Sequence, residues 1–231
     1  MTTQARDGHE PTSEARDSGA PGNALGGWSL IVSAALFWLS WYLMPQPGTN
    51  DARYILEAVA AHRSEVMWSA IAQTLSAVAL APAILVAARL RRGAGARWVQ
   101  AGALLLTLGA MGNAADAVYH QLAYEMTAPG VDPAGVAAVM AGMQTRQIGL
   151  LVPLMLAFFA GAVCLAVGLV RAKRVPRHLA QLYLLALVLG IVGRIVAVTQ
   201  HAGMRPFSLA VLGTVSVALA WSGWVLRKLP D

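Results

Sequence analysis

The sequence predicts an all-α fold, a polytopic bundle of about six transmembrane helices. Of the 231 residues, 57% are hydrophobic and 12% are charged, against roughly 25% charged residues in a soluble domain. A helix needs roughly 20 apolar residues to cross a hydrocarbon core of about 30 Å, and the apolar stretches suffice for about six crossings with short loops. We therefore expect one transmembrane helical domain over residues 26–229.

The expected crossings are bounded by polar, Pro and Gly residues. Residues 1–25 mix charged residues, Ser, Pro and Gly without apolar periodicity, which is typical of a disordered tail and not of a cleaved signal peptide. The six spans are expected at 26–44, 66–90, 98–125, 134–170, 178–200 and 206–226.

A short interfacial helix is expected after the first span. The run from Pro45 to Gly48 ends that span, because Pro lacks the helix donor and Gly favours a turn. Thr49 or Asn50 would cap a helix that reaches about Ser64 and is too polar to cross a membrane. Its apolar face carries Ile55, Leu56 and Val59, and its polar face carries Asp51, Arg53 and Glu57.

The fourth span is too long for a simple crossing. Asp132 before Pro133 predicts a helix start, with Asp as the cap and Pro at the first helical position. From Pro133 to Val170 there are 38 residues, which at about 1.5 Å per residue span about 57 Å. This helix must project, tilt or break, and Gly149 with Pro153 is the expected break.

The distribution of Lys and Arg predicts the orientation. Twelve lie on the tail, on the loops after the second and fourth spans, and at the C-terminus, whereas three, Arg53, Arg63 and Arg205, lie on the other side. This asymmetry places both termini in the cytoplasm. Because the basic residues flank apolar stretches instead of forming one polar face, a nucleic-acid partner is not expected.

Polar residues at membrane depth are the candidate site, since an ionisable side chain there costs at least about 2.5–3.5 kcal/mol. Asn113, Asp116 and His120 share one face of the third span, and Asp116 and His120 can hydrogen-bond and shift each other's proton affinity. The catalytic candidates are Asp116, His120 and, as a second acid, Glu125. All three are expected in the outer half of the membrane. The substrate-binding candidates are Asn113, Tyr119, Tyr124, Gln144, Arg146, Gln147, Arg194 and His201.

Structural alternatives stay open for these residues, and Tyr119 and Tyr124 fit an aromatic belt at the outer membrane boundary equally well. Arg146 and Arg194 can instead neutralise Asp116 and Glu125 as buried ion pairs. The glutamines Gln73, Gln144 and Gln147 can be helix-to-helix hydrogen bonds, and Glu125 and His201 can face water. No metal or cofactor is expected, because His120 and His201 lack a ligand spacing and Cys164 is the single cysteine.

Two resemblances bear on the chain. Through Asp116 to Gly130 and Met140 to Gln147, it resembles uncharacterised multi-pass membrane proteins common in actinobacteria, which implies a helical fold in a bacterial cytoplasmic membrane. In size, helical architecture and intramembrane acids it is also similar to the small integral membrane terpene cyclases. That similarity rests on architecture and transfers no catalytic residue.

The leading interpretation is an intramembrane enzyme that performs acid–base chemistry on a lipid-like substrate without a metal. The concrete reaction is protonation-initiated cyclisation of an isoprenoid, with Asp116 as the proton donor, tuned by His120. One alternative is a non-catalytic binding or transport protein with Arg146 and Arg194 as counter-charges. The other is a structural membrane subunit, and membrane lipids are partners in every case.

Overall fold

The computed structural model describes residues 21–45, 51–89, 93–200 and 205–228, without the side chains of residues 21, 147–148 and 193–200. The described chain is all-helical, which confirms the expected fold class. Its helices are α1 (Pro21–Leu43), α2 (Ala52–Ala61), α3 (Arg63–Arg89), α4 (Ala96–Met126), α5 (Pro133–Arg171), α6 (His178–Gln200) and α7 (Arg205–Leu226). Five described segments are long and apolar enough to cross a membrane, in α1, α3, α4, α5 and α7, and α6 adds an apolar stretch over His178–Val192. The chain is therefore a multi-pass membrane protein.

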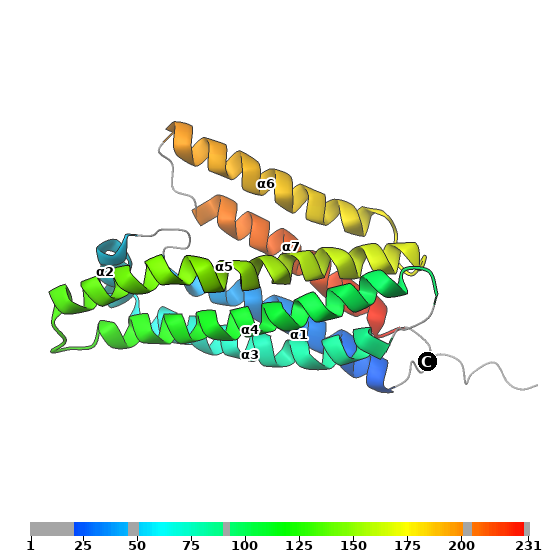
Figure 1. Ribbon diagram of the computed structural model, residues 1–231, viewed down its shortest axis with the longest axis horizontal. Helices are drawn as coiled ribbons and strands as arrows, with labels where there is room; N and C mark the ends of the chain where they lie inside the picture. Colours follow the sequence, from blue (N-terminus) through cyan, green and yellow to red (C-terminus); the bar gives the residue numbers. More distant parts are fainter. Residues whose placement is uncertain (1–20, 46–50, 90–92, 201–204, 229–231) are drawn as a thin grey trace, which may run out of the picture.

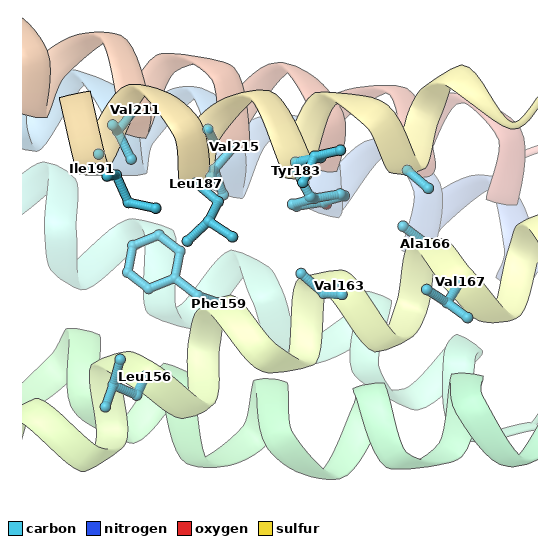
Figure 2. A pocket seen from close by; sticks show the side chains of 14 residues that line it. Leu156, Phe159, Val163, Ala166, Val167, Tyr183, Leu187, Ile191, Val211 and Val215 are labelled. Carbon is cyan, nitrogen blue, oxygen red and sulfur yellow. The ribbon is translucent and has the colours of Figure 1, made fainter. Parts of the chain in front are cut away.

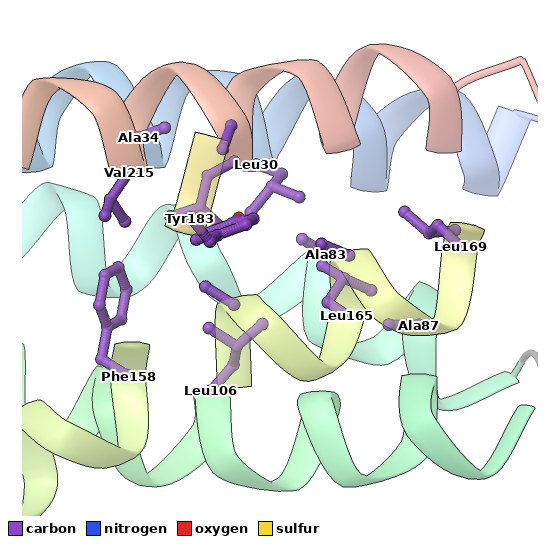
Figure 3. Close-up of a cluster of buried hydrophobic side chains, with 14 of the residues drawn as sticks. Leu30, Ala34, Ala83, Ala87, Leu106, Phe158, Leu165, Leu169, Tyr183 and Val215 are labelled. Atoms are coloured by element: carbon purple, nitrogen blue, oxygen red, sulfur yellow. The ribbon is translucent and has the colours of Figure 1, made fainter. Parts of the chain in front are cut away.

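The long helices run side by side along the longest axis of the molecule (Figure 1). The most extensive contacts join α4 to α5, α1 to α3, α3 to α4 and α1 to α7. Helix α6 lies outermost and packs mainly on α7. The main apolar core is shared by α1, α3, α4, α5, α6 and α7 (Figure 3), and at its centre the ring centroids of Phe37 and Phe158 lie 4.8 Å apart.

The N-terminal boundary of α1 differs most from the expected spans. This helix begins at Pro21 instead of residue 26, so the expected tail is shorter by five residues. Proline suits a first helical turn because its missing N–H would have no helical partner there. The rest of the expected tail lies outside the described residues.

Glycines allow α4 and α5 to approach until their backbones touch. A Cβ atom on Gly102 would lie 2.7 Å from the backbone N of Leu165, and one on Gly161 would lie 2.7 Å from the backbone N of Leu106. Gly168 meets α4 in the same way. Small residues of this kind favour tight packing where apolar side chains gain nothing by leaving lipid.

Helix α2 lies at the end of the bundle opposite the N-terminus of α1 and the C-terminus of α7 (Figure 1). Its cap is Asp51, whose carboxylate accepts from the backbone N–H groups of Arg53 and Tyr54. The expected caps, Thr49 or Asn50, are therefore wrong, and the helix ends at Ala61 instead of Ser64. The expected apolar face is confirmed. It packs on Met44, Val66, Ala123 and Met140 through Ile55, Leu56 and Val59.

Helix α5 is continuous over 39 residues, so the expected break at Gly149 and Pro153 is wrong. The expected start is confirmed, since the Asp132 carboxylate accepts from the backbone N–H groups of Ala134 and Gly135. Nothing lies within 4 Å of a Cβ built on Gly149, which leaves the turn before Pro153 room to adapt. The helix accommodates its length by projecting beyond its apolar segment, Gly149–Arg171, where α4 and α2 accompany it.

We predict that Gly161→Ala lowers the free energy of unfolding by about 1–3 kcal/mol, because the added methyl meets backbone atoms of α4 that cannot move independently. The control is Gly142→Ala, where a Cβ meets nothing within 4 Å and alanine favours the helix. Thermal unfolding of the detergent-purified variants compares them. Equal stabilities would show that the α4–α5 contact is looser than described.

Candidate functional site

Serines hold α1 and α3 in antiparallel register. Ser33 Oγ donates to Ser76 O at 2.8 Å, and Ser76 Oγ donates back to Ser33 O at 2.8 Å. Two turns along both helices, Ser69 Oγ donates to Ser40 O at 2.7 Å. All four side chains are buried. Sequence reasoning missed them, although the spacing of seven residues on both helices was a readable signal.

Gln73 extends this polar contact from α1 to α4. Its Nε2 donates to Asp116 Oδ2 at 3.3 Å, and its Oε1 accepts from Ser40 Oγ. The side chain is fully buried. The interpretation of Gln73 as a helix-to-helix hydrogen bond is therefore confirmed. We call the buried set Ser33, Ser40, Ser69, Gln73, Ser76, Asp116 and His120 the polar seam.

Asp116 and His120 meet at the end of the polar seam. Asp116 Oδ2 lies 3.6 Å from His120 Nε2, and the two residues are 5% and 2% exposed. On the other side of the imidazole, Nδ1 lies 3.1 Å from Ser69 Oγ. The helical spacing of four residues thus brings the pair together, and α3 fixes the orientation of both side chains.

The contacts of the pair limit how its protons can be arranged. With the hydroxyl hydrogen of Ser69 on Ser40 O, His120 Nδ1 is the donor to Ser69 Oγ, and the other tautomer reverses these roles. In the first case, a neutral imidazole presents a bare Nε2 to Asp116 Oδ2, which is itself an acceptor. One proton between these two atoms removes the conflict, as a neutral acid beside neutral imidazole or as carboxylate beside imidazolium. Both arrangements carry no net charge, which suits a membrane interior.

Two hydrogen-bonding groups beside the pair lack partners within the described residues. Asn113, one turn before Asp116, is fully buried, and neither its Oδ1 nor its Nδ2 is paired. Trp41 stands edge-on to His120 with ring centroids 6.0 Å apart, and its buried Nε1 is also unpaired. A buried polar group without a partner costs about 1–3 kcal/mol, and native structures keep few of them. Two donor groups and one acceptor next to the pair are therefore unpaired within the described part of the chain.

Tyr119 and Gln144 connect the site to α5. The Tyr119 hydroxyl donates to Met140 Sδ at 2.9 Å and accepts from Gln144 Nε2 at 3.2 Å. The ring centroid of Tyr119 lies 6.4 Å from that of His120. Gln144 thus forms a hydrogen bond between α5 and α4, which confirms the structural interpretation of this residue.

The structure does not bring Glu125, Tyr124 or Arg146 to the pair. Glu125 follows Asp116 by nine residues, about half a turn round the helix, and lies exposed in a groove of about 360 Å³ between α3 and α4. Tyr124 carries the guanidinium of Arg63 over its ring at 4.0 Å. Arg146 is exposed, and the described part of the chain records no ion pair from it to Asp116 or Glu125. Glu125 is therefore not a second acid beside Asp116, and Arg146 is not a counter-charge to either carboxylate.

Three of the expected substrate-binding residues have side chains that the structure does not describe. His201 lies outside the described residues, and the backbones of Gln147 and Arg194 are helical without a described side chain. No group of three or more His, Cys, Asp or Glu that could hold a metal ion occurs among the described residues.

A large apolar cavity lies away from the pair, between α5, α6 and α7 (Figure 2). Its volume is about 840 Å³. Side chains such as Phe159, Val163 and Leu187 make it apolar, and its lining contains no carboxylate or imidazole. It can accept a hydrocarbon chain but provides no proton donor except the phenol of Tyr183.

We predict that Gln73→Leu lowers the free energy of unfolding by about 1–3 kcal/mol, because it leaves Ser40 and Asp116 with fewer buried partners. The matched control is Gln121→Leu on α4, whose side chain is exposed and should change stability by less than about 0.5 kcal/mol. Chemical or thermal unfolding in detergent measures both. An unaffected Gln73→Leu variant would mean that the polar seam does not hold the helices.

No protein-family model, no curated protein and no solved structure matches the chain. The resemblances to actinobacterial membrane proteins and to membrane terpene cyclases thus stay expectations. Function has to be inferred from the geometry of the site.

Proposed function

We propose that this membrane protein holds an exchangeable proton on Asp116 and His120 and uses it in acid–base chemistry on a lipid-like molecule. The observation that carries the proposal is the amide of Asn113, which has no partner among the described residues, one turn from an Asp116–His120 contact of 3.6 Å that a shared proton would stabilise. If the polar groups only stabilised the fold, an unpaired amide beside them would lower the stability without any benefit. A ligand that both donates and accepts a hydrogen bond would pair it.

The surrounding residues suit proton transfer. Gln73 Nε2 already donates to the Asp116 carboxylate, and it would stabilise the negative charge that appears when the pair gives up its proton. Ser69 orients the imidazole through Nδ1. A positioned acid of this kind contributes about 10²–10⁴-fold to a reaction rate.

Cyclisation of an isoprenoid is the specific reaction we propose. The pair protonates a carbon–carbon double bond, and a neighbouring double bond closes the ring onto the resulting cation. The ring-closed cation then loses a proton to the pair, which forms the neutral product and restores the acid. The product is an isomer of the substrate, so no co-reactant is needed. Trp41 and Tyr119, the aromatic rings next to His120, are the groups available to stabilise the cation.

A structural role is the second candidate, and the close burial of the pair favours it. Asp116 and His120 are almost completely covered, and the serines and Gln73 are paired across three helices. In that case the polar seam only selects helix partners. A transport role for an anionic solute has less support, because Arg146 lies exposed and not beside the pair.

For location we propose a bacterial cytoplasmic membrane with both termini in the cytoplasm. The N-terminus of α1 and the C-terminus of α7 lie at the same end of the bundle (Figure 1). Arg89, Arg171 and Arg227 lie at this end too, and an excess of basic residues is typical of the cytoplasmic side.

We predict that Asn113→Leu separates the two candidates. The change keeps the side-chain size and removes two unpaired polar atoms, so the ligand-free protein should melt at the wild-type temperature or above. Prenyl alcohols should stabilise the wild type, by about 2.7 kcal/mol at 100 times the dissociation constant, and should not stabilise the variant. Thermal unfolding with and without a panel of these alcohols gives both numbers.

Asp116→Asn completes this test. For an acid–base site, this variant folds near the wild-type melting temperature and loses turnover of the stabilising alcohol. If it instead collapses and no alcohol stabilises the wild type, the polar seam is structural and the enzymatic proposal is abandoned.

A further inference from the structure

We propose that the corner where α1 meets α7 binds the phosphate of an anionic membrane lipid. Four residues form this Trp–Arg corner, namely Trp28, Trp224, Arg227 and Lys228. It lies near the N-terminus of α1, whereas Asp116 and His120 lie in the C-terminal half of α4, and that helix ends at the opposite end of the bundle (Figure 1). The inference is therefore independent of the proposed acid–base function.

Two glycines create the Trp–Arg corner. A Cβ atom on Gly27 would lie 2.4 Å from Gly223 O and 2.5 Å from the Cβ of Arg227, so α1 and α7 touch through their backbones. Trp28 and Trp224, each next to one of these glycines, thereby meet edge to face with ring centroids 6.3 Å apart. They are 48% and 44% exposed. Exposed tryptophans at the end of a span are typical of the lipid headgroup region.

The tryptophans hold a guanidinium at that depth. The Cζ atom of Arg227 lies 3.3 Å from the ring centroid of Trp224 and 4.7 Å from that of Trp28. Lys228 Nζ lies 5.1 Å from the Trp224 ring. The guanidinium lies over the tryptophan rings, and its buried Nε has no partner among the described residues. A phosphate accepts two parallel hydrogen bonds from a guanidinium edge.

Charge complementarity selects an anionic occupant. The described cations at this end of the bundle are Arg89, Arg97, Arg171, Lys173, Arg174, Arg177, Arg227 and Lys228. No described carboxylate accompanies them, because Asp51, Glu57, Glu65, Glu125 and Asp132 lie at the opposite end and Asp116 lies within the bundle. Basic clusters beside a span attract anionic lipids with about 1 kcal/mol per Lys or Arg.

The exposed tryptophans favour a lipid over a soluble phosphate. Their rings offer apolar surface next to the cations, which the glycerol and upper acyl region of a lipid can cover while its phosphate meets Arg227. A soluble anion would contact only the cationic groups of Arg227 and Lys228. A lipid therefore gains from both parts of the corner.

The experiment measures lipid binding to the full-length protein by native mass spectrometry, with phosphatidylglycerol and phosphatidylcholine added to the detergent. Phosphatidylglycerol should bind more tightly to the wild type. Arg227→Gln with Lys228→Gln should weaken it about 30-fold, or about fivefold per cation, and should leave phosphatidylcholine unchanged. Arg53→Gln, an exposed cation at the opposite end, is the matched control and should keep wild-type binding.

Three results would overturn the proposal. Equal binding of the two lipids would exclude recognition of the charge, and an equal loss in Arg53→Gln would show a diffuse attraction to the whole protein. Full displacement of phosphatidylglycerol by millimolar inorganic phosphate would show a site for a soluble anion. If the double variant does not fold, Lys228→Gln alone decides, with a fivefold loss expected and no loss contradicting the proposal.

Discussion

The hydrogen bonds that pass from Ser40 through Gln73 to Asp116 tie α1, α3 and α4 together, and the other helices are placed against this group. Apolar side chains cannot select a register in a membrane, because lipid tails are as apolar as the helices themselves. Buried polar groups can, since a slip of one residue would leave several of them unpaired. With α1 fixed in this way, Phe37 meets Phe158 of α5 and Gly27 meets α7.

Two kinds of contact therefore divide the bundle. Toward the N-terminus of α4, the α4–α5 contact is made by glycines such as Gly102 and Gly161, and its hydrogen bonds lie farther along at Tyr119, whereas the α1–α3–α4 contact is polar. The groups of Asn113 and Trp41 that lack partners among the described residues accompany the polar contact, so the proposed acid–base chemistry would lie on this side of α4. The apolar cavity under α6 is lined by α5, α6 and α7 and contains no residue of the polar seam.

The sequence predicted the helices, which depend on composition. It failed for the members of the site, which depend on the direction in which each side chain points. Apolar length located the helices, and Asp132 with Pro133 marked the start of α5, because these signals are local. Membrane depth alone suggested that Glu125 and Arg146 join Asp116, but depth does not specify the face of the helix. The serines of the polar seam are uncharged, so a search for ionisable residues at membrane depth does not select them. Pro153 did not break α5, because neighbouring helices and an open turn accommodate proline in a membrane.

The unpaired amide of Asn113 places a condition on any ligand of the site. Desolvating the amide without partners destabilises the ligand-free protein, and a ligand that pairs it recovers that energy as affinity. Because neither Oδ1 nor Nδ2 has a partner among the described residues, the matching group must donate and accept at once, as a hydroxyl does and a hydrocarbon does not. The same hydroxyl, held one turn from Asp116, would lie within reach of the proton on the pair. An alcohol therefore fits the site better than a plain alkene, and its hydroxyl would be held before any proton is transferred.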